Sequence, residues 1–211
     1  MLACHPVTRG EHIRDRRAAS ELVALAVALL PPAPVREEAE RLNASLPAAT
    51  ATGLRLDADH LPHITLIQQF VRHSDLDAAM DRIDEAVAGT APLSLRVSGS
   101  ARPGRSVWMV VDRTPELLAL HARLMDALAG LERDGGDAAA FHDRNARVSD
   151  IRWVAGYRRA AAFDAYAPHI TLGHAPEPPR VAPFDFEASE VVACHLGRFC
   201  TCRRILRAWR L

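Results

Sequence analysis

The chain has 211 residues, 49% of them hydrophobic, which is enough to bury a sizeable core in one large domain or in two small halves. Basic and acidic residues number 26 each, and this balance argues against sequence-blind binding to long nucleic acid, which depends on excess positive charge. The 26 basic residues are all arginine, so the sequence excludes a lysyl-nucleotidyl intermediate, a Schiff base and a Walker-type phosphate loop.

The N-terminal part contains a polar extension followed by one apolar run. Residues 1–20 are rich in arginine and show no clear period, so we treat them as a flexible tail or a short, loosely attached helix. The run from Leu22 to Leu30 follows acidic residues, is too short to cross a membrane and ends in two prolines. We therefore predict a buried first strand in a cytoplasmic protein without membrane association.

Two helices are predicted in the first half from apolar residues that recur every three or four positions. The first of these stripes comprises Val35, Ala39, Leu42 and Leu46. Ser74 and Asp77 are typical of a capping box before the second helix. Its stripe comprises Leu76, Met80, Ile83 and Val87.

The middle of the chain predicts a hairpin and a third helix. Leu93–Val97 alternates as a half-buried strand should, and Val107–Val111 returns after a loop that contains glycine and proline. Thr114 and Pro115 form a typical helix start. The apolar stripe of that helix comprises Leu117, His121, Leu124, Leu128 and Leu131.

The last third begins with a polar segment, residues 132–150, whose Gly135-Gly136 pair makes it the best candidate for a mobile loop. Three strands are predicted to close the chain, at 184–187, 191–196 and 204–211. Each half then holds helices and strands in a similar order. We therefore predict an α+β fold for residues 21–211, a single domain of two pseudo-symmetric lobes of antiparallel sheet flanked by helices, with a cleft between them.

The four cysteines do not predict a metal site. Cys200 and Cys202 are separated by one residue, not by the two that zinc sites usually have, and no second close pair accompanies them. Cys4 and Cys194 stand alone. We expect small apolar residues in a reducing environment.

The segment Pro-His-Ile-Thr-Leu occurs twice, at residues 62–66 and 168–172. Isoleucine, threonine and leucine favour strands, and residues two apart on a strand share a face. His63 and Thr65 should therefore point to one side and the apolar residues into the core. The same pattern pairs His169 with Thr171.

Two imidazoles and two hydroxyls that converge on one cavity suit in-line displacement at phosphorus. One neutral histidine can take a proton from water, while the other, protonated, gives one to the leaving oxygen. Threonine hydroxyls can donate hydrogen bonds to the non-bridging oxygens. No metal or other cofactor is required, and a zinc site on the same histidines lacks a persuasively spaced third ligand.

The paired motifs resemble the 2H phosphoesterase superfamily, in particular its RNA 2',3'-cyclic phosphodiesterase and 2'-5' RNA ligase branch. The resemblance covers most of the chain from Leu22 onward and implies two lobes around a cleft. It implies that His63 and His169 are the general acid and base, in an order left open, and that Thr65 and Thr171 hold the phosphate. It also implies catalysis without metal or nucleotide cofactor.

The substrate implied by this resemblance is an RNA 3' end or a small cyclic nucleotide, opened to a 2'-phosphate by a protein that we expect to be monomeric. Formation or cleavage of 2'-5' bonds is also expected of this family. Alternatives are a 2'-5' oligonucleotide or a cyclic-phosphate metabolite as substrate. A different class of function would be an RNA-end binding module with little turnover.

Weaker candidates lie near the motifs. Phe70, Arg72 and Tyr166 are predicted substrate contacts, because a nucleoside needs an aromatic ring to stack on and a cation near its phosphate. Other aromatic and arginine side chains near the motifs are expected to be core or solvated surface. They are Trp108, Trp153, Tyr157, Arg105 and Arg158.

Two further groups are weighed as well. The five arginines between Arg198 and Arg210 form either an RNA-end contact or the wet face of the last strands. Three histidines flank the motifs without repeating their positions between the halves, and we leave them out of the catalytic set. They are His60, His73 and His174.

Overall fold

A computed structural model describes residues 21–47 and 53–211, so the prediction for residues 1–20 lies outside the described part of the chain. Eight strands form one sheet in the order β6-β3-β4-β5-β2-β1-β7-β8, and every neighbouring pair is antiparallel. The strands are β1 (Leu22–Leu30), β2 (Ile64–Arg72), β3 (Leu93–Ala101), β4 (Ser106–Val111), β5 (His169–His174), β6 (Phe184–Ala188), β7 (Glu190–Leu196) and β8 (Cys202–Arg210).

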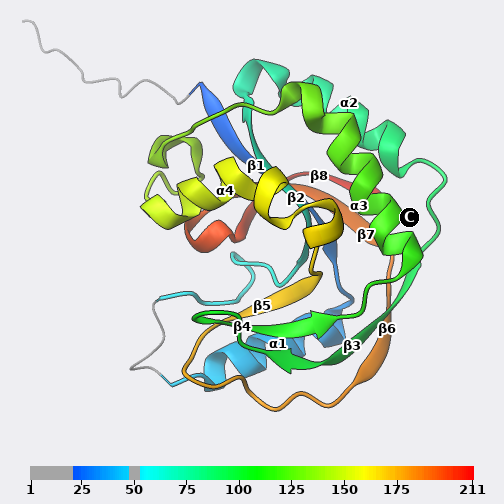
Figure 1. The fold of residues 1–211 in the computed structure, drawn as a ribbon, viewed down its shortest axis with the longest axis vertical. Helices are drawn as coiled ribbons and strands as arrows, with labels where there is room; N and C mark the ends of the chain where they lie inside the picture. The colour runs from blue at the N-terminus through cyan, green and yellow to red at the C-terminus, as the bar shows by residue number, and fades with distance from the viewer. Residues whose placement is uncertain (1–20, 48–52) are drawn as a thin grey trace, which may run out of the picture.

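The sheet curls into an open half-barrel, with four α-helices packed around it (Figure 1). They are α1 (Ala33–Ser45), α2 (Leu76–Val87), α3 (Pro115–Leu128) and α4 (Val148–Ala161). The predicted α+β class and antiparallel sheet are thus confirmed. No helix among the described residues is long and apolar enough to cross a membrane.

The two repeat strands, β2 and β5, are neighbours at the centre of the sheet. Ile64 pairs with Ile170, and each is the third residue of its copy of the repeat. An antiparallel pair centred on equivalent residues creates a local two-fold relation. The strands β6-β3-β4-β5 lie on one side of this point and β2-β1-β7-β8 on the other.

The helices cross between these two halves. Helix α1 follows β1 but packs against β5, whereas α3 follows β4 but packs against β2 (Figure 1). Helix α4 also covers β2, and α2 packs against α3 and β8. Each repeat strand is therefore covered by a helix from the other half, so the two halves are in contact through helices as well as through the sheet.

Most predicted elements occur, with boundaries shifted by a few residues. The first strand spans Leu22–Leu30 as predicted, and its side chains are almost all buried. Thr114 caps α3 by accepting a hydrogen bond from the Leu117 N–H. The capping box at Ser74 is wrong, because α2 starts one residue after Asp75 with no side-chain cap, and the Ser74 hydroxyl donates to Asp75 instead.

The segment predicted as a mobile loop is partly packed and runs into a helix that the sequence did not reveal. The Arg133 N–H donates to the Phe70 carbonyl at 2.9 Å, and a side chain at Gly136 would collide with the Phe70 ring. Helix α4 then begins at Val148. At its start the Asp150 carboxylate accepts a hydrogen bond from the Arg147 N–H, and the Arg147 side chain, which has no acceptor, cannot cap the helix.

The cysteines behave largely as expected. Cys194 and Cys202 are buried in β7 and β8, where they pack as small apolar side chains. Cys200 is half-buried in the short turn before β8, and Cys4 lies outside the described residues.

Candidate active site

Both copies of the repeat show the two faces predicted from strand periodicity. The side chains of Ile64 and Leu66 are fully buried, whereas those of His63 and Thr65 keep part of their surface exposed. The second copy, residues 168–172, has the same pattern at the same positions. The alternation therefore places one imidazole and one hydroxyl from each copy on the open side of the sheet.

These four side chains line a single pocket of about 490 Å³. The pairing of Ile64 with Ile170 explains why they meet, since the antiparallel register places His63 beside Thr171 and Thr65 beside His169. Sequence-distant groups are thus brought together by the central strand pair. The pocket size is typical of small-molecule sites.

Each imidazole is oriented by a main-chain carbonyl two residues before it. His63 Nδ1 lies 2.8 Å from the Leu61 oxygen, and His169 Nδ1 lies 2.7 Å from the Ala167 oxygen. A carbonyl oxygen can only accept, so both Nδ1 atoms carry the hydrogen. In the neutral rings this leaves the Nε2 lone pair as the site that exchanges protons.

The two histidines differ in their surroundings. Burial within the pocket walls lowers the pKa of both, and for His169, where the neighbouring His63 adds to the effect, it falls to about 4. His169 also stacks on the Trp108 indole, with ring centroids 3.6 Å apart and planes 12° from parallel. Among the described residues no ring stacks on His63.

Helices from the opposite half hold the last residue of each repeat. The Asn43 amide on α1 donates to the Leu172 carbonyl at 2.6 Å, and His121 Nδ1 on α3 donates to the Leu66 carbonyl at 2.6 Å. Leu66 and Leu172 are equivalent residues of the two copies. Both donors are buried, so these bonds fix the strand ends near the pocket.

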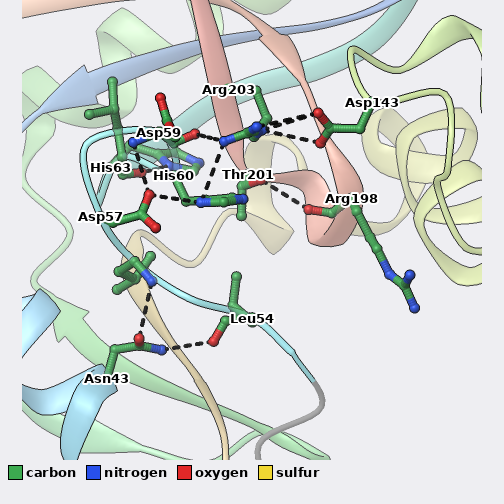
Figure 2. A network of polar contacts seen from close by, with 12 residues as sticks. Asn43, Leu54, Asp57, Asp59, His60, His63, Asp143, Arg198, Thr201 and Arg203 are labelled. Atoms are coloured by element: carbon green, nitrogen blue, oxygen red, sulfur yellow. Dashed lines mark hydrogen bonds and ion pairs between the residues drawn. The ribbon is translucent and has the colours of Figure 1, made fainter.

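The chain segment that leads to His63 is anchored at two points. Figure 2 shows Asn43 contacting the segment, where its amide donates to the Leu54 oxygen and its side-chain oxygen accepts from the Leu56 N–H. Farther along, Arg203 bridges the Asp143 carboxylate and the Asp59 carbonyl. Arg203, one of the five arginines between Arg198 and Arg210, therefore has a structural role.

Aromatic side chains form much of the remaining wall. Tyr166 and Tyr157 donate from their hydroxyls to the Thr65 and Leu66 carbonyls, and burial raises the pKa of both phenols. The aromatic residues of the lining are Trp108, Trp153, Tyr157, Tyr166 and Phe199. We expected Trp108, Trp153 and Tyr157 to be core or surface residues. The sequence did not reveal their place in the pocket, because none of them belongs to a repeated segment.

One end of the pocket carries a charged cluster. Arg147 forms an ion pair with Asp150, which is 2% exposed, and its guanidinium lies 3.9 Å from the centre of the Phe199 ring. His174 lines the same end, and burial together with Arg147 and Arg105 lowers its pKa. Arg147 is the only arginine in the pocket wall within the described part of the chain.

Gln68 is a further lining residue that sequence reasoning missed. It is 3% exposed, and its side-chain oxygen accepts no hydrogen bond from the described protein atoms. Buried amide oxygens normally have a donor, supplied by protein, water or ligand. The side-chain oxygen of the neighbouring Gln69 is likewise buried without a donor among the described protein atoms.

Of the three weaker candidates for substrate contact, one lines the pocket and two do not. Tyr166 lines the pocket. Phe70 lies farther along β2, where it is fully buried against Phe141, and Arg72 is exposed at the end of that strand. Neither of these two residues lines the pocket, so we no longer propose them as contacts.

The described residues contain no group of three or more His, Cys, Asp or Glu side chains close enough to hold a metal ion. The residues at the pocket thus supply proton donors, proton acceptors and hydroxyls. This set supports acid–base chemistry on an anionic group such as a phosphate.

A family model described as the 2'-5' RNA ligase superfamily matches residues 31–191. The chain belongs to this superfamily. The matched residues include both copies of the repeat and most of the pocket wall. No curated protein matches the sequence.

Solved structures show the same fold for this superfamily member. A structure described as a phosphoesterase has a TM-score of 0.60 and 18% identity, and covers 90% of this chain and 98% of that chain. Escherichia coli LigT with NADP+ gives 0.60 and 19%, covering 90% and 99%. A Thermus thermophilus protein, TT0787, gives 0.55 and 15%, covering 90% and 98%. At these identities the likeness establishes the fold alone.

Proposed function

We propose that the protein is a metal-independent phosphodiesterase that opens 2',3'-cyclic phosphate ends of RNA, or small nucleotides of that kind, to 2'-phosphates. The observation that carries this proposal is the convergence of two identically oriented imidazoles and two hydroxyls on one pocket. Such a set matches the proton donor, proton acceptor and anion contacts that the reaction requires.

The environments of the two histidines suggest their roles. Burial lowers the pKa of His169 to about 4, so it is the neutral group that accepts a proton from water through Nε2. The Trp108 ring stacks on this imidazole and fixes its orientation. His63 gives its Nε2 proton to the departing 3'-oxygen, and the anionic phosphate favours its protonated form before the reaction.

Thr65 and Thr171 line the same pocket, and their hydroxyls would donate to the non-bridging oxygens, where negative charge accumulates. The Arg147 guanidinium, whose charge is balanced by Asp150, lies at one end of the pocket, and the aromatic wall offers faces on which a base can stack. LigT has been solved with 3'-AMP, NADP+, ATP and phosphate, which supports a nucleotide as the ligand class.

Ligation of 2'-5' bonds is the second activity that this site supports, since it uses the same groups with a hydroxyl in place of water. It requires no adenylated lysine, which agrees with the absence of lysine from the chain. A 2'-5' oligonucleotide or a cyclic-phosphate metabolite is the alternative substrate. An RNA-end binding module is the alternative without turnover.

Hydrolysis of 2',3'-cyclic nucleotides in excess chelator, followed by phosphorus NMR, tests the proposal. We expect a 2'-phosphate product from the wild type, and a rate lower by roughly 10²–10⁴-fold in His63→Ala and in His169→Ala. His73→Ala is the matched control, because His73 is exposed and lies outside the pocket.

Three outcomes would count against it. Unchanged turnover in either folded histidine variant would rule out the two-histidine mechanism. Complete loss in chelator alone would favour zinc chemistry. Tight binding of the cyclic nucleotide without product would favour the binding module.

A further inference from the structure

The sheet holds the two equivalent histidines in different ways. His169 is the first residue of β5, and it pairs with Val110 of β4. His63, at the same position of the other copy, lies one residue before β2, which begins at Ile64. A strand ladder fixes the main chain through its regular hydrogen bonds. The main chain at His63 therefore depends on contacts other than the pairing of β2.

The segment before His63, residues 54–62, makes these contacts, and we call it the lead-in segment. Its Leu61 carbonyl accepts the bond from His63 Nδ1, and the Leu61 N–H donates to the Cys202 carbonyl at 3.2 Å. Leu61 thus connects the imidazole to the first residue of β8 by an isolated bridge. A bridge at one residue fixes that point, but it does not fix the orientation of the chain that precedes it.

Arg203, the second residue of β8, supplies a second contact with the lead-in segment (Figure 2). Its Nη1 donates to the Asp59 carbonyl at 2.5 Å and lies 3.5 Å from His60 Nδ1. Its Nε donates to the Asp143 carboxylate at 3.1 Å. The planar guanidinium makes these contacts together because its N–H groups point in different directions. Arg203 therefore bridges the lead-in segment and the loop before α4.

The other end of this bridge is fixed to the sheet. Asp143 follows His142, whose N–H donates to the Leu196 carbonyl of β7 at 2.8 Å. Arg203 also lies against Gly197, where a methyl group would collide with the arginine side chain and with the Asp143 carboxylate. Glycine at position 197 therefore leaves the space in which the guanidinium and the carboxylate meet.

We propose that Arg203 is a positioning residue for His63, and that it acts through the lead-in segment to keep the Leu61 carbonyl on Nδ1. The inference rests on the proposed function, because the bond at Nδ1 leaves Nε2 of the same ring to exchange protons with the substrate. Without Arg203 the lead-in segment is held less firmly, so the carbonyl leaves Nδ1 for part of the time. His169 does not depend on this contact, because its own main chain belongs to the strand ladder.

Nitrogen NMR of the histidine rings tests the inference without any turnover. Above the pKa values of both rings, His63 and His169 of the wild-type protein should each show the tautomer with its hydrogen on Nδ1. Arg203→Ala should move His63 toward a mixture of the two tautomers, whereas His169 should keep its wild-type signals. Gly197→Ala should have the same effect, because the added methyl displaces the arginine side chain.

The matched control is Arg204→Ala, which removes the exposed next residue of the same strand and should leave both rings unchanged. Arg203→Lys keeps a cation with fewer donors, so its His63 signals should lie between those of the wild type and Arg203→Ala. This milder variant also serves if Arg203→Ala does not fold.

The hydrolysis assay gives a second measurement on the same proteins. Arg203→Ala should lower kcat for a 2',3'-cyclic nucleotide roughly 10–100-fold, because a displaced proton donor is costly. The Leu61 carbonyl raises the pKa of His63, so its loss should also move the basic limb of the pH–rate profile to lower pH. Arg203→Lys should recover part of both effects.

The NMR result separates this inference from the proposed function. Unchanged His63 signals in folded Arg203→Ala and Arg203→Lys would overturn the positioning role, whatever the rates show. Equal changes at His63 and His169 would also overturn it, because they would mean a general loosening of the pocket. A change at His63 alone, in a protein that hydrolyses no cyclic nucleotide, would support the positioning role and contradict the proposed function.

Discussion

At the residue scale, Trp108 is the side chain that makes the two equivalent histidines unequal. Both imidazoles have the same carbonyl contact at Nδ1, but only His169 among the described residues has an indole stacked on it. A stacked aromatic pair contributes about 0.5–1.5 kcal/mol beyond burial and restricts the ring orientation. We regard Trp108 as a positioning residue for His169.

Trp108→Leu should lower kcat for cyclic-nucleotide hydrolysis roughly 10–100-fold, because small displacements of a proton acceptor are costly. In the wild type, kcat/KM should rise through pH about 4 as His169 loses its proton, and should fall as His63, whose pKa lies below 6.5, loses its own. Removal of the indole relieves part of the burial that lowers the pKa of His169, so the acidic limb should move to higher pH.

The pH–rate profile is the decisive measurement for this variant. Trp108→Phe keeps a stacking ring and should retain most of kcat with a smaller shift of the acidic limb. A reduced kcat with an unchanged acidic limb in Trp108→Leu would mean that the indole only fills space.

Residues of the site could be predicted where the sequence repeats them. His63 and Thr65 stand out because residues 168–172 duplicate their segment, and strand periodicity then fixes their common face. Trp108 and Gln68 belong to no repeated segment, and the sequence pattern of their strands does not distinguish them from core residues. Only the register of the folded sheet brings them to the pocket.

At the element scale, the packing of α1 against β5 is stabilised by the buried side-chain amide of Asn43. The Asn43 side chain bonds to the Leu172 and Leu54 carbonyls and to the Leu56 N–H. Asn43→Leu would leave these three main-chain groups without their partner. Each buried unpaired group costs about 1–3 kcal/mol, so the free energy of unfolding should fall by roughly 3 kcal/mol or more.

Urea unfolding measures this loss. Arg41→Ala on the exposed side of the same helix, which breaks only a surface ion pair, should change stability by less than about 1 kcal/mol. Asn43→Asp keeps the acceptor for the Leu56 N–H but places a buried carboxylate oxygen against two carbonyl oxygens, so it should be at least as unstable as Asn43→Leu. Equal stabilities for all three variants would show that the amide does not fasten α1 to β5.

Strands and most helices follow from the sequence because their apolar spacing is regular, as in β1 and α3. Helix α4 does not. Its buried residues are few, namely Asp150, Val154 and Tyr157, and Gly156 interrupts its interior. Its stability therefore depends on packing against β2, which no local pattern encodes.

At the scale of the whole molecule, buried histidines should make stability depend on pH. Burial lowers the pKa of five of them, namely His63, His121, His169, His174 and His195. Below pH 6.5 the unfolded chain binds protons that the folded chain does not, so the free energy of unfolding falls as pH falls. His169 alone should account for about 3 kcal/mol between pH 6.5 and 4.

Urea unfolding across this pH window tests the expectation, with His169→Gln as the comparison. The glutamine cannot take up the proton, so the variant should lose less stability on acidification than the wild type. Equal pH dependence of the two proteins would mean that His169 titrates normally in the folded state.

The pairing of Ile64 with Ile170 relates the two copies of the repeat at the pocket by a local two-fold axis. Read from either strand, it presents the same order of imidazole, isoleucine and hydroxyl. Under the proposed function, such a symmetric motif cannot distinguish the two directions in which a substrate strand could lie. The direction of the substrate strand would then be distinguished by parts of the pocket wall that the repeat does not duplicate. These parts are Trp108 on one side and α4 with Arg147 on the other.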